Sequence, residues 1–244
     1  MSRIRLFIDH PLSAGQEFPL GPEAAHYLGT VMRQDSGAGF LAFNGRDGEW
    51  LARISRLGRR DGAARAIERT RPQLDPPDLW LVFAPIRKSR TDFIVEKAAE
   101  LGAARILPVQ TDHTNAERIR RDRLQAHAIE AAEQCGGTHV AEVAELTPLA
   151  RLLDGWDEGR RILWADEARV GPVGTLAGLP RGPWAILIGP EGGFSPAERA
   201  RLASMGCVTP ISLGPRILRA DTAAVAALTL WQAHLGDWQG DRDA

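Results

Sequence analysis

A proline-rich segment divides this 244-residue chain into two parts with different patterns of apolar residues. Residues 71–78 hold three prolines, and proline extends neither a helix nor a central strand, so the segment is interpreted as a linker. Before it, short alternating segments are separated by Gly and Asp turns, which predicts a small β-rich domain, a barrel. After it, apolar runs alternate with helical stretches, which predicts a parallel sheet covered on both faces. We therefore expect an α/β protein with two domains, residues 1–72 and 73–244.

The expected elements follow from apolar periodicity and from capping residues. In the first domain we expect one helix at 22–33 and strands at 4–8, 40–43, 49–54 and 63–69. In the second we expect helices at about 92–101, 117–135, 196–204 and 221–235, and strands at 79–83, 106–109, 162–164, 184–188 and 208–213. Ser195, Pro196 and Glu198 together form the signature of a helix start with a capping box.

Two glycine-rich loops in the last quarter of the chain carry most of its functional information. They are Ile188–Phe194, with the sequence IGPEGGF, and Leu213–Ala223, with the sequence LGPRILRADTA. Each follows a predicted strand and runs into a predicted helix, and neighbouring loops of this kind are where an α/β sheet binds a small ligand. Glycines let the backbone approach such a ligand closely. Taken alone, residues 189–193 also fit a tight turn without a ligand.

Common nucleotide, hydrolase and metal motifs are absent from the sequence. The G-x-G-x-x-A pattern at 37–42 is followed by a strand-like run rather than a helix, so it is interpreted as a turn. Cys135 and Cys207 have no metal-ligand spacing, and no metal is expected. No secretory signal and no apolar run near the roughly 20 residues of a membrane span is present, so we expect a cytoplasmic protein that does not enter a membrane.

The charge distribution points weakly to the N-terminal part as the surface for a nucleic acid. Residues 1–72 hold eleven arginines against eight acids, whereas the remainder holds 19 Lys and Arg against 23 acids. The cluster Arg87–Arg90 follows a predicted strand and would face the same sheet edge as the glycine-rich loops. A solvated basic turn is the simpler interpretation of that cluster by itself.

Six blocks, taken in order, resemble the RsmE family of ribosomal RNA methyltransferases, which belongs to the SPOUT class. Besides the two glycine-rich loops, the blocks are Arg3–Phe7, His26–Leu28 with Val31–Arg33, Glu96–Gly102 and Glu130–Cys135. The resemblance implies a PUA-like RNA-binding β-barrel before an α/β trefoil-knot domain, and a homodimer. It also implies S-adenosylmethionine as cofactor, 16S ribosomal RNA or the small ribosomal subunit as partner, and methylation of uridine N3. The chain departs from the family where Gly137 replaces an arginine, Ala141 a proline and Asp221 a glutamate.

The resemblance also implies roles for individual residues. Cofactor contacts are expected from Leu163, Trp164, Ala165, Ile188, Gly189, Pro190, Glu191, Gly192, Ser212, Leu213, Gly214, Ile217, Leu218 and Thr222. RNA contacts are expected from Arg3, Arg5, Arg33, Arg87, Lys88, Arg90, Lys97 and Gln134. For catalysis we expect Arg219 to stabilise the negative charge of the deprotonated base, and Glu191 to orient the base or help remove its proton. Purely structural roles for both residues stay open.

Two alternative functions remain at this point. The chain could be a methyltransferase of the same fold that acts on another RNA, since the two glycine-rich loops concern only the cofactor. It could also be a non-enzymatic RNA-binding assembly factor, an idea that the substitution at Gly137 favours slightly.

Overall fold

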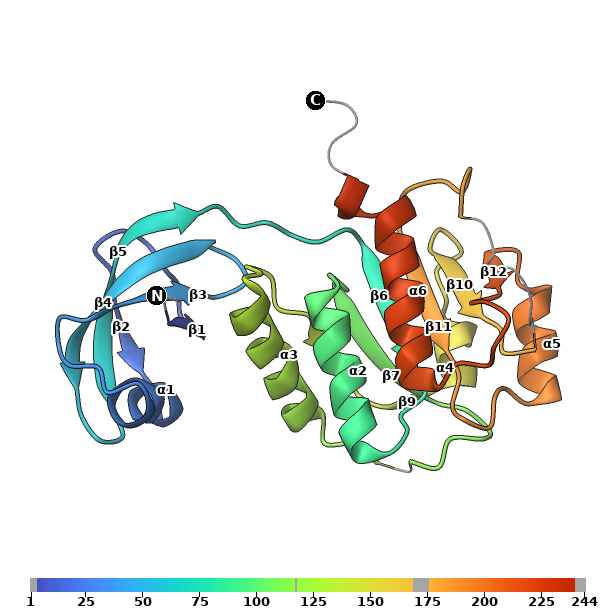
Figure 1. The fold of residues 1–244 in the computed structure, drawn as a ribbon, viewed down its shortest axis with the longest axis horizontal. Coiled ribbons are helices and arrows are strands. Elements are labelled where there is room, and N and C mark those ends of the chain that lie inside the picture. Colours follow the sequence, from blue (N-terminus) through green and yellow to red (C-terminus); the bar gives the residue numbers. More distant parts are fainter. Residues whose placement is uncertain (1–3, 117, 169–175, 240–244) are drawn as a thin grey trace. The chain divides into compact units, whose positions relative to one another are not determined.

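The computed structural model describes residues 4–116, 118–168 and 176–239. The chain forms two compact units, one of Met1–Asp75 with Ala132–Val140, and one of Pro76–Ala131 with Ala141–Ala244. Figure 1 shows the order of the elements in each unit. The first unit thus ends three residues later than the predicted boundary at 72 and includes a second segment, residues 132–140. That segment joins it because its backbone carbonyls accept hydrogen bonds from Arg5 and Arg71.

The first unit is built on a five-stranded sheet in the order β1-β3-β4-β5-β2. The strands are β1 (Arg5–Phe7), β2 (Glu17–Leu20), β3 (Gly39–Phe43), β4 (Glu49–Leu57) and β5 (Gly62–Arg71). β1 runs parallel to β3, and the other neighbours are antiparallel. Alternate residues such as Ala52 and Ile54 enter one core with Phe18, Leu28 and Phe40. This alternation is the period-2 pattern of the sequence.

The predicted helix at 22–33 is shorter than expected. Helix α1 covers Pro22–His26, and the chain continues as a π-helical turn over Tyr27–Val31. Arg33 then takes a positive φ of 52°, which is uncommon for a residue other than glycine. Because a residue in this left-handed conformation cannot continue a right-handed helix, the helical pattern ends before Arg33.

The second unit is built on a sheet in the order β12-β10-β11-β6-β7-β8, with β9 paired to β7, and all of its strand pairings among the described residues are parallel. The strands are β6 (Leu79–Phe83), β7 (Arg105–Gln110), β8 (Glu142–Val143), β9 (Thr147–Pro148), β10 (Arg161–Ala165), β11 (Trp184–Ile188) and β12 (Val208–Ile211). The helices are α2 (Lys88–Glu100), α3 (Arg121–Cys135), α4 (Leu149–Asp154), α5 (Pro196–Ser204) and α6 (Ala220–His234), followed by a 3-10 turn at Asp237–Gln239.

Two apolar cores cover the two faces of this sheet. One core contains Ile94 of α2, Leu124 of α3 and Leu228 of α6. The other contains Leu153 of α4 and Leu202 of α5. A strand buried on both faces needs apolar residues at every position, which explains the continuous runs in the sequence. The predicted parallel sheet with helices on both faces is confirmed.

Most predicted elements of this unit occur within a few residues of their expected bounds, and the strands at 79–83 and 184–188 match. Helix α4 and the short strands β8 and β9 were not expected. The trefoil knot stays a prediction. No helix in the described ranges is long and apolar enough to cross a bilayer.

Candidate functional site

Three loops meet at the carboxyl edge of the second sheet because their strands are neighbours. β10 lies between β11 and β12, and all three are parallel. The segments that follow them, residues 166–168, 189–195 and 212–219, therefore leave the sheet on the same side. The sequence predicted this meeting for the two glycine-rich loops, and the resemblance added cofactor contacts at residues 163–165, at the end of β10.

A small cavity of about 50 Å³ lies between the first and third of these loops. Its lining includes five predicted cofactor residues: Ala165, Leu213, Gly214, Ile217 and Leu218. Leu218 is half-buried in the wall, whereas 76% of Ile217 is exposed. The lining also includes Asp166, Glu167, Arg216 and Ala223.

Other predicted cofactor residues lie within strands or beside the cavity. Leu163, Trp164 and Ile188 are buried in the sheet. The Trp164 ring packs edge-on against Phe194 on the α5 side of the sheet, with 5.9 Å between the ring centroids. Only the backbone of Trp164 can therefore face a ligand at the end of the strand. Ser212 closes its own turn, since its Oγ accepts a hydrogen bond from the Gly214 backbone at 3.2 Å. Thr222 is exposed in the first turn of α6.

The loop after β11 needs glycine at two positions. A Cβ atom at Gly189 would lie 2.8 Å from the ring of Phe194, which is closer than side chains allow. Gly193 has a φ of +68°, and a Cβ there would lie 2.6 Å from Oε1 of Glu167. Pro190 is buried, and Glu191 and Gly192 are exposed. The loop is thus closely packed on its inner side and open on its outer side.

The turn after β7 holds this loop from outside, a contact that no sequence pattern indicated. Nδ1 of His113 lies 3.0 Å from the carbonyl oxygen of Gly192 and 3.1 Å from that of Gly193. A carboxylate oxygen of Asp112 lies 2.5 Å from the Ser195 hydroxyl. The predicted capping box at Ser195 and Glu198 is present as well. These contacts fix where the glycine-rich loop ends and α5 begins.

Three ion pairs fix the other two loops. Arg199 of α5 donates to Asp166 at 2.7 Å and to Glu167 at 2.9 Å. The hydrogen bond to Asp166 is the main cause of a raised pKa of Arg199. Arg90 of α2 pairs with Asp221, whose side chain is nearly buried at the start of α6. Because these acids are held by cations from other elements, the loops are positioned before any ligand binds.

Comparison with known proteins assigns the site to a family. Residues 73–232 match the RNA methyltransferase domain family, and residues 20–64 match the RNA methyltransferase PUA domain family. The chain is 30% identical to the ribosomal RNA small subunit methyltransferase E of Rickettsia conorii over 92% of this chain and 93% of that protein. It belongs to this family of RNA methyltransferases.

Solved structures agree with this assignment. The crystal structure of a ribosomal RNA small subunit methyltransferase E from Neisseria gonorrhoeae bound to S-adenosyl methionine is 26% identical, with a TM-score of 0.86 over 97% of this chain and all of that one. A putative methyltransferase from Legionella pneumophila, in complex with the bound cofactor SAM, is 29% identical with the same TM-score and the same coverage. The PUA-like and α/β organisation expected from the resemblance is confirmed.

The two predicted catalytic residues both lie at the carboxyl edge of this methyltransferase domain. Arg219 is the N-cap residue of α6 and is exposed. Glu191 is exposed in the glycine-rich loop. Neither side chain has a hydrogen-bonding or ionic partner among the described residues, and the catalytic roles of both stay predictions.

The predicted RNA-binding residues fall into three groups. Arg3 lies outside the described residues. Arg33, Arg87, Lys88 and Gln134 are exposed. Arg5, Arg90 and Lys97 are engaged within the protein, since Arg90 pairs with Asp221 and Lys97 lies 2.5 Å from Glu100.

The expectation for Arg5 does not fit the structure. Its side chain is 11% exposed and lies 2.6 Å from Glu49, which is 4% exposed. Its remaining nitrogens donate to the backbone carbonyls of Ala132, Glu133 and Gly137. Burial alone would raise the pKa of Glu49, but hydrogen bonds from Arg71 and Arg5 outweigh it and lower the pKa to about 2. Arg5 therefore holds the segment 132–140 in the first unit.

Among the described residues, no three His, Cys, Asp or Glu side chains gather in a group that could hold a metal ion.

Proposed function

We propose that this chain transfers the methyl group of S-adenosylmethionine to N3 of a uridine in the 16S ribosomal RNA of the small ribosomal subunit. The observation that carries the proposal is the joint match of the PUA domain and the methyltransferase domain to one family of ribosomal RNA methyltransferases. The alignment with SAM-bound structures over nearly the whole chain supports the choice of cofactor. The proposed substrate places the protein in the cytoplasm, where ribosomal subunits occur.

The residues around the small cavity fit the chemistry of this cofactor. Leu213, Leu218 and Ala223 offer an apolar wall for an adenine ring, and a Cβ at Gly214 would meet no neighbour within 4 Å. The cavity volume of about 50 Å³ is well below the roughly 300–1,000 Å³ that is usual for small-molecule sites, so in this proposal the loop 213–218 moves outward when the cofactor binds. When bound, the cofactor supplies an electrophilic methyl group on a sulfonium centre.

The protein's part in the reaction is to orient the base and to handle one proton. Uridine N3 carries a weakly acidic proton that must leave before or during methyl transfer, and the negative charge then spreads onto O2 and O4. In this proposal Arg219 stabilises that charge, as a preorganised donor does in an oxyanion site. Glu191 orients the base or accepts the N3 proton. Both residues are exposed at the loop edge, where a base can reach them.

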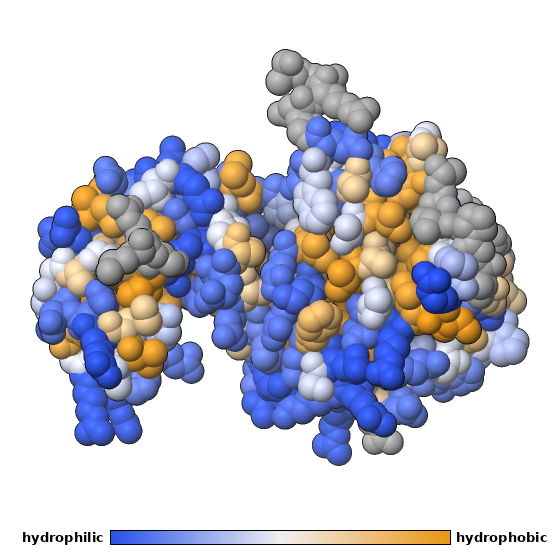
Figure 2. Space-filling model, in the orientation of Figure 1, coloured by the Kyte–Doolittle hydropathy of each residue, from blue (hydrophilic) through white to orange (hydrophobic). Residues whose placement is uncertain are grey.

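We further propose a homodimer, supported by the composition of α6. Between Thr222 and His234 this helix has no charged residue, although Val225, Ala226, Thr229 and Leu230 are only half-buried. Figure 2 shows apolar residues at the surface over α6, above a hydrophilic lower edge where α2 and α6 begin. An apolar helix face at the surface is typical of an interface. Light scattering on the purified chain should give twice 26.6 kDa, and a mass of 26.6 kDa would refute the dimer.

Nucleoside mass spectrometry of ribosomal RNA tests the proposed reaction. We expect 3-methyluridine to disappear from the small-subunit RNA of cells that lack this protein and to return with the wild-type gene. Loss of a different modification, or of a modification in another RNA, would replace the proposed substrate. Unchanged modifications, together with no binding of S-adenosylmethionine in calorimetry, would favour the assembly factor.

A further inference from the structure

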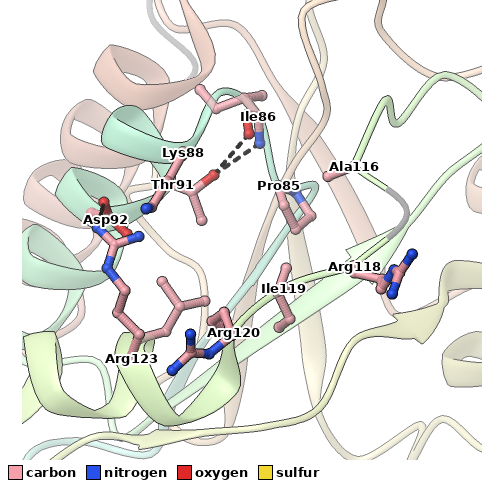
Figure 3. Close-up of a pocket in the computed structure, with 11 residues that line it drawn as sticks. Pro85, Ile86, Lys88, Thr91, Asp92, Ala116, Arg118, Ile119, Arg120 and Arg123 are labelled. Carbon is pink, nitrogen blue, oxygen red and sulfur yellow. Dashed lines mark hydrogen bonds and ion pairs between the residues drawn. The ribbon is translucent and has the colours of Figure 1, made fainter.

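A second and larger cavity opens at the same edge of the methyltransferase sheet, away from the cofactor loops. It has a volume of about 470 Å³ and lies between the loop after β6, the start of α2, residues 118–120 and the start of α3. Figure 3 shows its lining, with Lys88 and Thr91 on one side and Arg118 and Ile119 on the other. The volume is within the range of about 300–1,000 Å³ that is usual for small-molecule sites. None of the residues proposed above for cofactor binding or for catalysis lines this cavity.

The charged residues around the cavity favour an anionic ligand. Four cations line it, Lys88, Arg118, Arg120 and Arg123, against a single acid, Asp92. Asp92 is paired with Arg123. Lys88 and Arg118 are exposed and have no acidic partner among the described residues. Helices α2 and α3 both begin at this cavity, so the positive ends of two helix dipoles add to the field.

The floor of the cavity is apolar and its edge is fixed. Its apolar lining residues are Pro85, Ile86, Ala116, Ile119 and Leu124. Thr91 Oγ1 accepts from the Ile86 backbone N–H at 3.0 Å and donates to the Ile86 carbonyl at 3.1 Å, as the dashed lines in Figure 3 mark. This pair of bonds fixes the loop between β6 and α2. A ligand that suits the cavity therefore has a flat apolar part and an anionic part.

We propose that this cavity binds one nucleotide of the RNA substrate beside the target uridine, with its base against Ile119 and its phosphate between Lys88 and Arg118. The proposal rests on the proposed function, because it takes RNA as the substrate. β6 lies two strands away from β10, which is about 10 Å at a strand spacing of about 4.8 Å. The small cavity lies between the loops after β10 and β12, so a base in this second cavity is a different base, a short distance along the same RNA strand.

Binding of small probes tests the cavity directly. The full chain is titrated with cytidine 5′-monophosphate, ribose 5-phosphate and inorganic phosphate in a calorimeter; cytosine is neither the target base nor the base of the cofactor. We expect the nucleotide to bind at least about fivefold more tightly than ribose 5-phosphate, as base packing on a protein surface predicts. The double variant Lys88→Ala/Arg118→Ala should lose the binding. Equal affinity for the nucleotide and ribose 5-phosphate would overturn the proposal.

Salt dependence of RNA binding gives an independent test. Affinity for 16S ribosomal RNA is measured at several salt concentrations for the wild type, Lys88→Ala, Arg118→Ala and the control Arg151→Ala, an exposed cation on α4. Each cavity variant should lower the slope of log affinity against log salt by about 1, and the control should not. Slopes equal to that of the control would overturn the proposal.

A third measurement separates failure of this proposal from failure of the proposed function. All variants are titrated with S-adenosylmethionine, and the cavity variants should bind it as the wild type does, which also shows that they are folded. If the wild type binds neither S-adenosylmethionine nor RNA, the proposed function fails. The cytidine 5′-monophosphate titration still decides whether the cavity binds a nucleotide.

Discussion

His113 and Gly192 are joined by a hydrogen bond of 3.0 Å between the imidazole Nδ1 and the glycine carbonyl oxygen. The carbonyl can only accept, so Nδ1 carries the hydrogen. The bond connects the turn after β7 to the glycine-rich loop after β11, 79 positions later in the sequence. We infer that His113 positions the glycine-rich loop after β11, which is proposed to contact the cofactor.

Replacing His113 with alanine should weaken the binding of S-adenosylmethionine. The loss of one hydrogen bond of about 1 kcal/mol corresponds to roughly a fivefold higher dissociation constant. Calorimetry on His113→Ala measures it, and His10→Ala, at a half-buried residue of the first unit, is the control. Wild-type affinity in His113→Ala would show that the loop keeps its shape without this contact.

Gly189→Ala should impair the same loop by steric conflict rather than by loss of a bond. The new Cβ would lie 2.8 Å from Phe194, so the ring or the loop must shift, at a cost of about 1–3 kcal/mol. Gly155→Ala is the matched control, because a Cβ there meets nothing within 4 Å and φ is −104°. In urea unfolding and in titration with S-adenosylmethionine, Gly189→Ala should be less stable and bind more weakly than Gly155→Ala. Equal stability and affinity of the two variants would show that Phe194 does not restrict the loop.

Arg90→Ala should act on stability and not on the salt dependence of RNA binding. Arg90 was expected to contact RNA, but it pairs with Asp221, whose carboxylate is nearly buried. Removing the arginine leaves that charge unpaired, and we expect a loss of about 1–3 kcal/mol in unfolding free energy. The double variant Arg90→Ala/Asp221→Asn should recover part of the lost unfolding free energy, because it removes the unpaired charge. A lower salt slope with unchanged stability would restore Arg90 to the RNA surface.

The first unit should lose stability in acid because of Glu49. Its pKa is lowered from 4.5 to about 2 in the folded state, so its contribution is complete above pH 4.5 and disappears as the pH falls towards 2. A shift of this size corresponds to a contribution on the order of 3 kcal/mol. Urea unfolding of the full chain between pH 7 and pH 2 should show a smaller dependence in Glu49→Gln.

Glu17→Gln provides the control for that measurement. Glu17 pairs with Arg65 at 3.3 Å, but both side chains are about half exposed, and such pairs contribute at most about 1 kcal/mol. Its pH profile should match that of the wild type. If the pH profile of Glu49→Gln also matches that of the wild type, the ion pairs of Glu49 with Arg5 and Arg71 do not control stability in acid.

The sequence predicted what depends on local patterns. Apolar runs indicated the strands of the parallel sheet, and the Ser195 capping box marked the start of α5. It could not predict contacts between distant residues. The basic strand at Arg5 resembled an RNA-binding surface, but Glu49, 44 positions away, turns that side chain inward. His113 had no partner nearby in sequence, and the fold supplies one.

The role of Arg219 is the last expectation open to a direct test. Arg219 is the N-cap residue of α6, and its side chain makes no capping hydrogen bond and has no partner among the described residues. If it stabilises the charge on the deprotonated base, Arg219→Ala should lower the single-turnover rate by about 100-fold or more, as removal of one donor from an oxyanion site does. Its affinity for S-adenosylmethionine should stay unchanged. Arg151→Ala, at an exposed arginine of α4 that does not line the cavity, is the control. Weaker cofactor binding with an unchanged rate in Arg219→Ala would remove the catalytic role and leave Arg219 as a cofactor-loop residue.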